Sequence, residues 1–220
     1  HWELNQFTKV RDVLEILLIN WPKPLYWIQL AGVYRELGDE KTSYSLTEAA
    51  YKQGFLDDKE QQLVTAAQIQ IARDAPIKCA WILEKAFKEE RVEQTAKNVR
   101  TLGQCYMQAN EYRKAVGPLK KAAAEESDAI LWMQIGQVYM QLDDMKNAAD
   151  AFEKTVAALK KDKSSEADEQ RFSAIMMKGQ ALIELKEYKE ARELLSQASR
   201  MAKDRRDKKT VRQWLSYLKN

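Results

Sequence analysis

One pattern of small and apolar residues recurs about every 34 residues in this chain, and it constrains the fold more than any other feature. Within each copy the residues are spaced three, four and seven apart, which is the spacing of one helix face. Each copy has two such stripes separated by a short turn, so each is predicted to be a helical hairpin. The five copies read, in chain order, Trp27, Leu30, Ala31, Tyr34, Ser43 and Ala50; Val64, Ala67, Ile71, Ala80 and Phe87; Val99, Leu102, Gly103, Tyr106, Ala115, Leu119 and Ala122; Trp132, Ile135, Gly136, Tyr139, Ala148 and Phe152; and Ile175, Gly179, Leu182, Ala191, Leu195 and Ala198.

Turn residues and small residues support this interpretation. Residues typical of turns, among them Gly38, Asn110 and Asp143, lie between the two stripes of each copy. Small residues such as Gly136 and Ala148 occupy matching places on the two stripes, where they let two helices approach closely. The 220 residues include 7 glycines and 4 prolines, well below average usage of about 7% and 5%. The sequence therefore predicts an all-α chain.

The repeat also divides the chain into segments. Between the fourth and fifth hairpins, residues 160–169 are charged and poor in apolar side chains, so we expect a soft joint there. Ser165 and Asp168 resemble a capping box that would start a lengthened helix. Pro118 lies within a predicted second helix and is expected to kink it. The predicted segments are the second helix of a truncated repeat at 1–22, hairpins at 24–57, 61–94, 96–128, 129–162 and 172–205, and a capping helix at 207–220.

The order W-x2-L-G-x2-Y, then Ala, then an aromatic residue or Leu, then Ala, resembles the tetratricopeptide repeat. Gln68 and Lys178 depart from this pattern at single positions. The resemblance implies a right-handed α-solenoid of antiparallel helix pairs, whose first helices line a concave surface. It also implies which positions of these helices face a partner; in the third to fifth repeats the candidate partner-binding residues are Lys97, Arg100, Gln104, Met107, Gln108, Met133, Gln137, Met140, Gln141, Met176 and Gln180.

Three glutamines of this set, Gln104, Gln137 and Gln180, are in register on successive repeats. A row of amides can hydrogen-bond the backbone of a bound segment, and flexible methionines adapt to varied side chains. The surface would then hold a peptide or a helix of a partner. The alternative interpretation is that these glutamines are ordinary exposed helix formers and that the methionines belong to the core or its rim.

Charge and reactive residues narrow the classes of function. The net charge of +3 singles out neither nucleic acid nor an anionic membrane as the partner. Residues 203–212 contain basic side chains interrupted by Asp204 and Asp207, which is typical of a solvated helix junction. The longest apolar stretch is too short to span a bilayer. His1 is the sole histidine, and Cys79 and Cys105 lack C-x-x-C spacing, which favours small core residues. We therefore expect no catalytic residues, no metal site and no cofactor.

A narrower resemblance concerns three runs of sequence. Residues 27–34 followed by 38–41, residues 52–56 and residues 214–218 are similar to the periplasmic tetratricopeptide proteins associated with TonB energy-transduction systems of Gram-negative bacteria. This resemblance implies a periplasmic accessory protein that binds a component of the TonB, ExbB and ExbD complex and supports iron uptake. In that oxidising compartment Cys79 and Cys105 would need burial or pairing.

Two alternatives stay open from the sequence. One is a cytoplasmic adaptor or assembly protein with the same kind of binding surface. The other is a self-associating structural module, a homodimer formed through the N-terminal half-repeat, whose apolar face has no helix to cover it in the predicted array.

Overall fold

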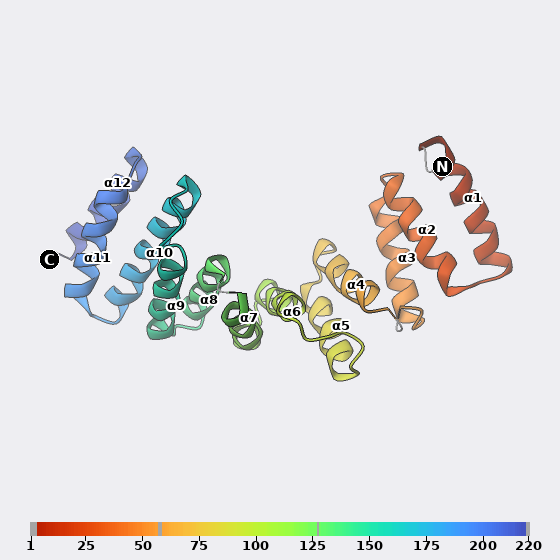
Figure 1. Cartoon of the computed structure of the whole chain (residues 1–220), viewed down its shortest axis with the longest axis horizontal. Helices are drawn as coiled ribbons and strands as arrows, with labels where there is room; N and C mark the ends of the chain where they lie inside the picture. The colour runs from red at the N-terminus through yellow and green to blue at the C-terminus, as the bar shows by residue number, and fades with distance from the viewer. Residues whose placement is uncertain (1–3, 57–58, 127, 219–220) are drawn as a thin grey trace. The chain divides into compact units, whose positions relative to one another are not determined.

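The computed structural model describes residues 4–56, 59–126 and 128–218, and within these ranges it contains twelve helices and no strand (Figure 1). The predicted all-α fold is thereby confirmed. The chain divides into two compact units, residues 1–94 and residues 95–220. Each unit has its own arrangement of helices and is described by itself.

The first unit contains five helices: α1 (Leu4–Asn20), α2 (Pro24–Glu36), α3 (Glu40–Lys52), α4 (Glu60–Ala72) and α5 (Pro76–Lys88). Helix α1 packs on α2 through a small cluster around Leu14, Leu30 and Val33. Helices α2 and α3 pack along each other, as do α4 and α5, whereas α3 and α4 touch far less. The two hairpins of this unit are therefore loosely joined.

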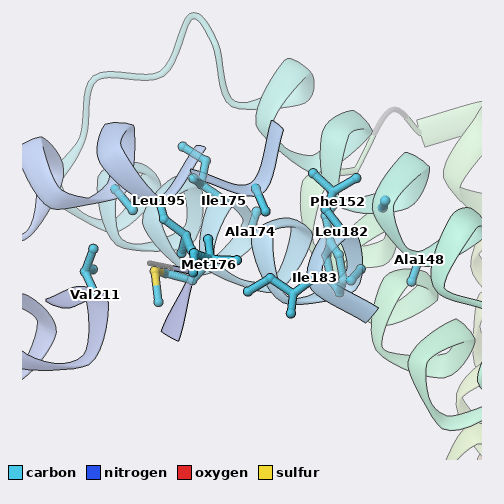
Figure 2. Packing of buried hydrophobic residues seen from close by; sticks show 14 residues of the cluster. Ala148, Phe152, Ala174, Ile175, Met176, Leu182, Ile183, Leu195 and Val211 are labelled. Carbon is cyan, nitrogen blue, oxygen red and sulfur yellow. The ribbon is translucent and has the colours of Figure 1, made fainter. Parts of the chain in front are cut away.

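The second unit contains seven helices: α6 (Ala96–Gln108), α7 (Tyr112–Glu126), α8 (Ala129–Gln141), α9 (Met145–Ala158), α10 (Ser165–Glu184), α11 (Tyr188–Met201) and α12 (Arg205–Tyr217). Each helix packs on the next one along the chain. Phe152, Leu182, Leu195 and Val211 belong to one continuous core that runs from α9 to α12 (Figure 2). The last helix contributes Val211, which is fully buried, so it covers the apolar side of the final hairpin.

All five hairpins turn in the same way. The second residue after each first helix has a positive φ, +81° at Gly38 and between +55° and +63° at Asp74, Asn110, Asp143 and Lys186. The next amide then donates to a carbonyl five residues back, for example from Asp144 to Tyr139 at 2.9 Å. This pairing is the Schellman motif, which satisfies carbonyl groups that the helix end leaves open. The turn residues of the sequence thus stop each first helix at the same register.

Small residues set the distance between the helices of a hairpin. A Cβ placed on Gly103 would lie 2.7 Å from Cγ of Leu119, and one on Gly179 would lie 3.2 Å from Cγ of Leu195. Both leucines are fully buried. The large residue of the second helix therefore uses the space that the glycine leaves.

The segment between the fourth and fifth hairpins differs from the predicted soft joint. Helix α10 begins at Ser165, so the lengthened helix that the sequence predicts is present, and its N-cap is Ser164, whose hydroxyl accepts from the amide of Ala167 at 3.1 Å. Arg171 donates to the carbonyls of Leu159 and Asp162. These bonds tie the connection to the first turns of α10, so the joint is held in place and the capping residue is Ser164, not Ser165. Helix α7 continues through Pro118.

Candidate functional site

The predicted amide row lies on α6, α8 and α10 of the second unit. Gln137 is exposed, and Gln104 and Gln180 are half-buried. Within the described part of the chain none of the three amides takes part in a hydrogen bond, which leaves their donors and acceptors available to a ligand. Lys97, Gln108 and Gln141 are also exposed, and Met107 is half-buried.

Four other predicted site residues pack against the core or form ion pairs within the second unit. Met176 is only 6% exposed and belongs to the core, and Met133 and Met140 pack against the same core. Arg100 Nη1 lies 2.8 Å from Asp128 Oδ2 and 3.4 Å from Glu126 Oε2. Met176 is too deeply buried to contact a ligand directly, because its side chain fills space between helices. Partner binding at Met133, Met140 and Arg100, which are half-buried, stays a prediction.

A cleft of about 460 Å³ opens in the first unit between α2, α3 and α4. It lies where the two hairpins are loosely joined, and it falls within the 300–1,000 Å³ range of ligand sites. Its walls are formed by Ile28, Ala31, Gly32 and Arg35 of α2, Ser43, Tyr44, Thr47 and Ala50 of α3, Leu56, and Gln61, Gln62, Thr65, Gln68, Ile69 and Ala72 of α4.

The walls of the cleft contain amides and one charge. At the start of α4 the cleft is lined by Gln61 and Gln62, and Oε1 of Gln62 is buried without a hydrogen-bond partner among the described residues. Arg35, in the last turn of α2, is the one charged side chain among the described residues that line the cleft. A buried acceptor that finds no partner costs free energy.

A cluster of ion pairs connects the α2–α3 hairpin to the α4–α5 hairpin beside the cleft. Glu48 of α3 accepts from Arg73 at the end of α4, lies 2.9 Å from Lys52 Nζ and lies 3.9 Å from Lys78 Nζ of α5. The hydrogen bond from Lys52 and the positive charges of Arg73 and Lys78 lower the pKa of the Glu48 carboxyl below its usual value. Glu48 is therefore held in its charged form across the weak α3–α4 contact.

The sequence contained a signal for this cleft that the prediction did not use. Counted from the start of each hairpin, Ile28, Gly32 and Arg35 occupy the same positions on α2 as Arg100, Gln104 and Met107 on α6. The prediction applied these positions to the third, fourth and fifth repeats alone. The same helix positions in the first two repeats give seven of the fifteen residues that line the cleft.

A second exposed surface lies on α1. Val13, Ile16 and Ile19 are 56%, 58% and 81% exposed, while Leu14 on the opposite side packs on α2. The exposed side chains follow one another at three-residue spacing, so they form an apolar face. This face belongs to the predicted half-repeat.

Other predicted features are located as follows. Cys79 and Cys105 are both fully buried, and His1 lies outside the described residues. No group of three or more metal-ligating side chains occurs within the described ranges. None of the helices described is both long and apolar enough to cross a membrane.

Sequence comparison gives two matches to family models. The model of anaphase-promoting complex (cyclosome) subunit 3 matches residues 78–155, and the tetratricopeptide repeat model matches residues 172–205. No curated protein sequence is significantly similar to the chain. The second match covers the second half of α10 and all of α11, where the sequence places the fifth repeat.

Comparison with solved structures gives the same class of fold. YrrB, described as a TPR protein with an unusual peptide-binding site, has a TM-score of 0.66 at 15% identity and covers 96% of this chain and 100% of its own. A MamA structure has a TM-score of 0.64 at 17% identity, covering 81% of this chain and 91% of its own. PilW, a type IV pilus biogenesis factor, has a TM-score of 0.55 at 14% identity, with 89% and 86% covered.

These identities show the fold alone, and the fold is that of a tetratricopeptide α-solenoid, as predicted. Together with the two family models, the structural matches support the tetratricopeptide-repeat family for this chain.

Proposed function

We propose that this chain is a non-catalytic scaffold that binds a segment of a partner protein on the face of its first helices. The observation that carries the proposal is the α2–α3–α4 cleft, because it places the amides of Gln61, Gln62 and Gln68 and several apolar groups along one open channel. The amide row of the second unit offers three more amides, on three further helices. The backbone N–H and C=O groups of a bound segment would form hydrogen bonds with these amides instead of with water.

The setting that we propose is the periplasm, with the chain as an accessory of a TonB-dependent iron-uptake system. The support for this setting is the resemblance of residues 27–34, 52–56 and 214–218 to the tetratricopeptide proteins associated with those systems. The partner would then be a component of the TonB, ExbB and ExbD complex. A cytoplasmic adaptor is the alternative setting for the same scaffold.

The experiment is a pull-down from Gram-negative periplasmic extract, followed by mass spectrometry. The bait variant changes Gln104, Gln137 and Gln180 to Lys. A control variant with the same charge change carries Lys at Gln53, Gln197 and Gln213, which are exposed and outside the predicted row. Capture of a TonB-complex component by wild type and control, but not by the row variant, supports both the setting and the surface.

Other outcomes separate the two parts of the proposal. Equal capture by all three proteins moves the binding site away from the amide row. Capture of no TonB-complex component contradicts the TonB setting and returns the cytoplasmic adaptor to first place.

Self-association through α1 is a second candidate, favoured by the apolar face of Val13, Ile16 and Ile19. A dimer would remove this face from water, which is favourable in proportion to the apolar area buried. Light scattering over a range of concentrations tests it. A mass that rises with concentration in wild type and stays constant in Ile16→Lys supports the dimer, and a constant mass in both contradicts it.

A further inference from the structure

We propose that one face of α12 binds the surface of a bilayer that contains anionic phospholipids. This cationic face consists of Arg205, Lys208, Lys209 and Arg212. The inference goes beyond the proposed function, because it assigns a second kind of ligand to a helix that forms no part of the cleft or of the amide row. Three observations carry it: the single sign of the charges, the anchoring of the helix and the kinds of group that the face lacks.

The cationic face contains charges of one sign. Its four residues are spaced three, four and seven apart, so they share one side of the helix, and all four are exposed. They border one open hollow together with Gln213 and Ser216, and no acidic side chain among the described residues lines it. None of the four forms an ion pair within the described ranges. Other exposed faces of the second unit mix the two signs, as α9 does with Asp150, Glu153 and Lys154.

The two aspartates that interrupt the basic run in the sequence lie away from this face. Asp204 is the N-cap of α12, and its Oδ1 accepts from the amide of Asp207 at 2.7 Å. Both aspartates line a separate hollow together with Asp168 and Phe172 of α10. In the sequence the acidic and basic residues of this segment alternate, whereas the folded helix separates them.

The opposite side of α12 is fixed to the rest of the second unit, where α12 lies beside α11 (Figure 1). Val211 is fully buried, and Trp214 and Leu215 pack against the core. Arg192 of α11 donates to the carbonyl of Leu218 at the end of the helix. The cationic face is therefore held outward, and the apolar side of α12 is not available for insertion into a bilayer. Binding at this face depends on charge at the level of the headgroups.

The groups that the face lacks argue against a protein or a nucleic acid as the partner. Protein partners gain most of their affinity from buried aromatic and other anchor residues, and no apolar side chain among the described residues lines this hollow. Single-stranded nucleic acid stacks its bases on aromatic side chains, which the hollow also lacks. Domains that bind duplex nucleic acid are typically strongly basic overall, whereas this chain has a net charge of only +3.

Anionic lipids fit the groups that the face does contain. Clusters of about four to eight Lys and Arg on an amphipathic helix are typical of sites for anionic lipids. The four charges lie along about 10 Å of helix, so a flat layer of headgroups can contact all of them at once. Tyr217, exposed four residues after Gln213, adds an aromatic ring of the kind found at the headgroup level. Neighbouring cations on a helix repel one another, and bound anionic headgroups reduce that repulsion.

The experiment is sedimentation of the full chain with vesicles of phosphatidylcholine alone and with vesicles in which half of the lipid is phosphatidylglycerol. We expect binding only where phosphatidylglycerol is present, and we expect it to be lost as NaCl rises from about 0.05 to about 0.5 M, because salt screens the charges. Each cation near such a surface contributes about fivefold in affinity, so Lys208→Gln combined with Arg212→Gln should weaken binding about 25-fold. The melting temperature should stay the same, because both positions are exposed.

The matched control combines Lys120→Gln with Lys146→Gln, at exposed positions on α7 and α9. It removes the same charge from the chain and should bind the vesicles as wild type does. Equal weakening in the two double variants, or equal binding to the two kinds of vesicle, overturns the proposal.

A fluorescent DNA duplex and polyglutamate are titrated in parallel at the same salt concentration. If wild type binds one of these and not the vesicles, and the α12 variant loses that binding, the face belongs to a nucleic acid or to an acidic protein segment and the lipid assignment is wrong. Absence of vesicle binding by wild type also overturns the proposal. The scaffold function is tested separately by capture of a protein partner, so it does not depend on this result.

Discussion

A Cβ built on Gly136 would lie 2.4 Å from Cε1 of Phe152, so the phenyl ring of α9 occupies space that only a glycine on α8 leaves free. Phe152 is fully buried and is among the largest side chains of the core. The same core cluster contains Ile175 and Leu182 of α10. The contact of Gly136 with Phe152 therefore sets how closely α8 and α9 approach each other.

Gly136→Ala is therefore expected to destabilise the second unit by about 1–2 kcal/mol. Overpacking costs about 1–3 kcal/mol, and the better helix propensity of alanine returns about 0.5–1 kcal/mol. Gly179→Ala should cost less, because the Cβ would be 3.2 Å from Leu195 and that side chain needs to shift only slightly. Urea denaturation of the two variants measures the difference. Equal losses would mean that Phe152 can relax as easily as Leu195.

Glu48 predicts a pH dependence of stability. Its folded-state pKa is lowered, so its contribution is fully present above the unfolded-state value of about 4.3 and is lost as the pH falls through the folded-state value. We expect Glu48→Gln to lower the melting temperature near neutral pH and to have little effect at about pH 3. Glu184→Gln, at an exposed position, is the control. A loss that persists unchanged at low pH would show that charge is not what Glu48 contributes.

The repeat itself was predictable because it depends on local rules that recur five times. Small residues at fixed helical spacing and turn residues such as Asn110 and Asp143 predicted the hairpins, and the structure shows a positive φ at both residues. Gly136 was assigned to close packing from its position alone. Helices, turns and small-residue contacts are set by neighbours within one repeat, so one repeat contains enough information to predict them.

The cleft was not predictable in this way, because it depends on how far apart two repeats lie. The connection between α3 and α4 spans residues 53–59, whereas the connection between α7 and α8 spans residues 127–128. The longer connection permits the weaker packing in the first unit. Met176 shows the same limit within a predicted site. Its position on the helix predicted a surface, but α10 packs on α9 and α11, which buries the side chain.

Asp128 has two roles that substitution can separate. Its Oδ1 accepts from the amide of Ile130 at 2.7 Å as the N-cap of α8, and its Oδ2 lies 2.8 Å from Arg100 Nη1. Asp128→Asn keeps a capping oxygen and loses the ion pair, which should cost about 0.2–1 kcal/mol. Asp128→Ala also loses the cap, worth about 1 kcal/mol more. Thermal denaturation measures the stability of both variants. Equal losses in Asp128→Asn and Asp128→Ala would show that the capping hydrogen bond does not contribute separately from the ion pair.

Val211 anchors the last helix. It is fully buried on α12, so Val211→Ala should destabilise the packing of α12 by about 1–2 kcal/mol through lost contacts. Hydrogen exchange provides the readout, because amides of α12 should exchange faster while those of α8 stay protected. Faster exchange throughout the second unit would instead mean that α12 is essential to the whole core. Thr210→Ala, at a half-buried neighbouring position, is the control.

The most direct measurement of the central claim compares wild type and Gly32→Leu in their melting temperatures and in the amount of partner that each captures in the pull-down. If the α2–α3–α4 cleft binds the partner, the melting temperature of Gly32→Leu stays close to that of wild type, because a Cβ at Gly32 meets no atom within 4 Å, and capture falls at least tenfold. Wild-type capture at an unchanged melting temperature would contradict the claim that the α2–α3–α4 cleft is where this scaffold holds its partner.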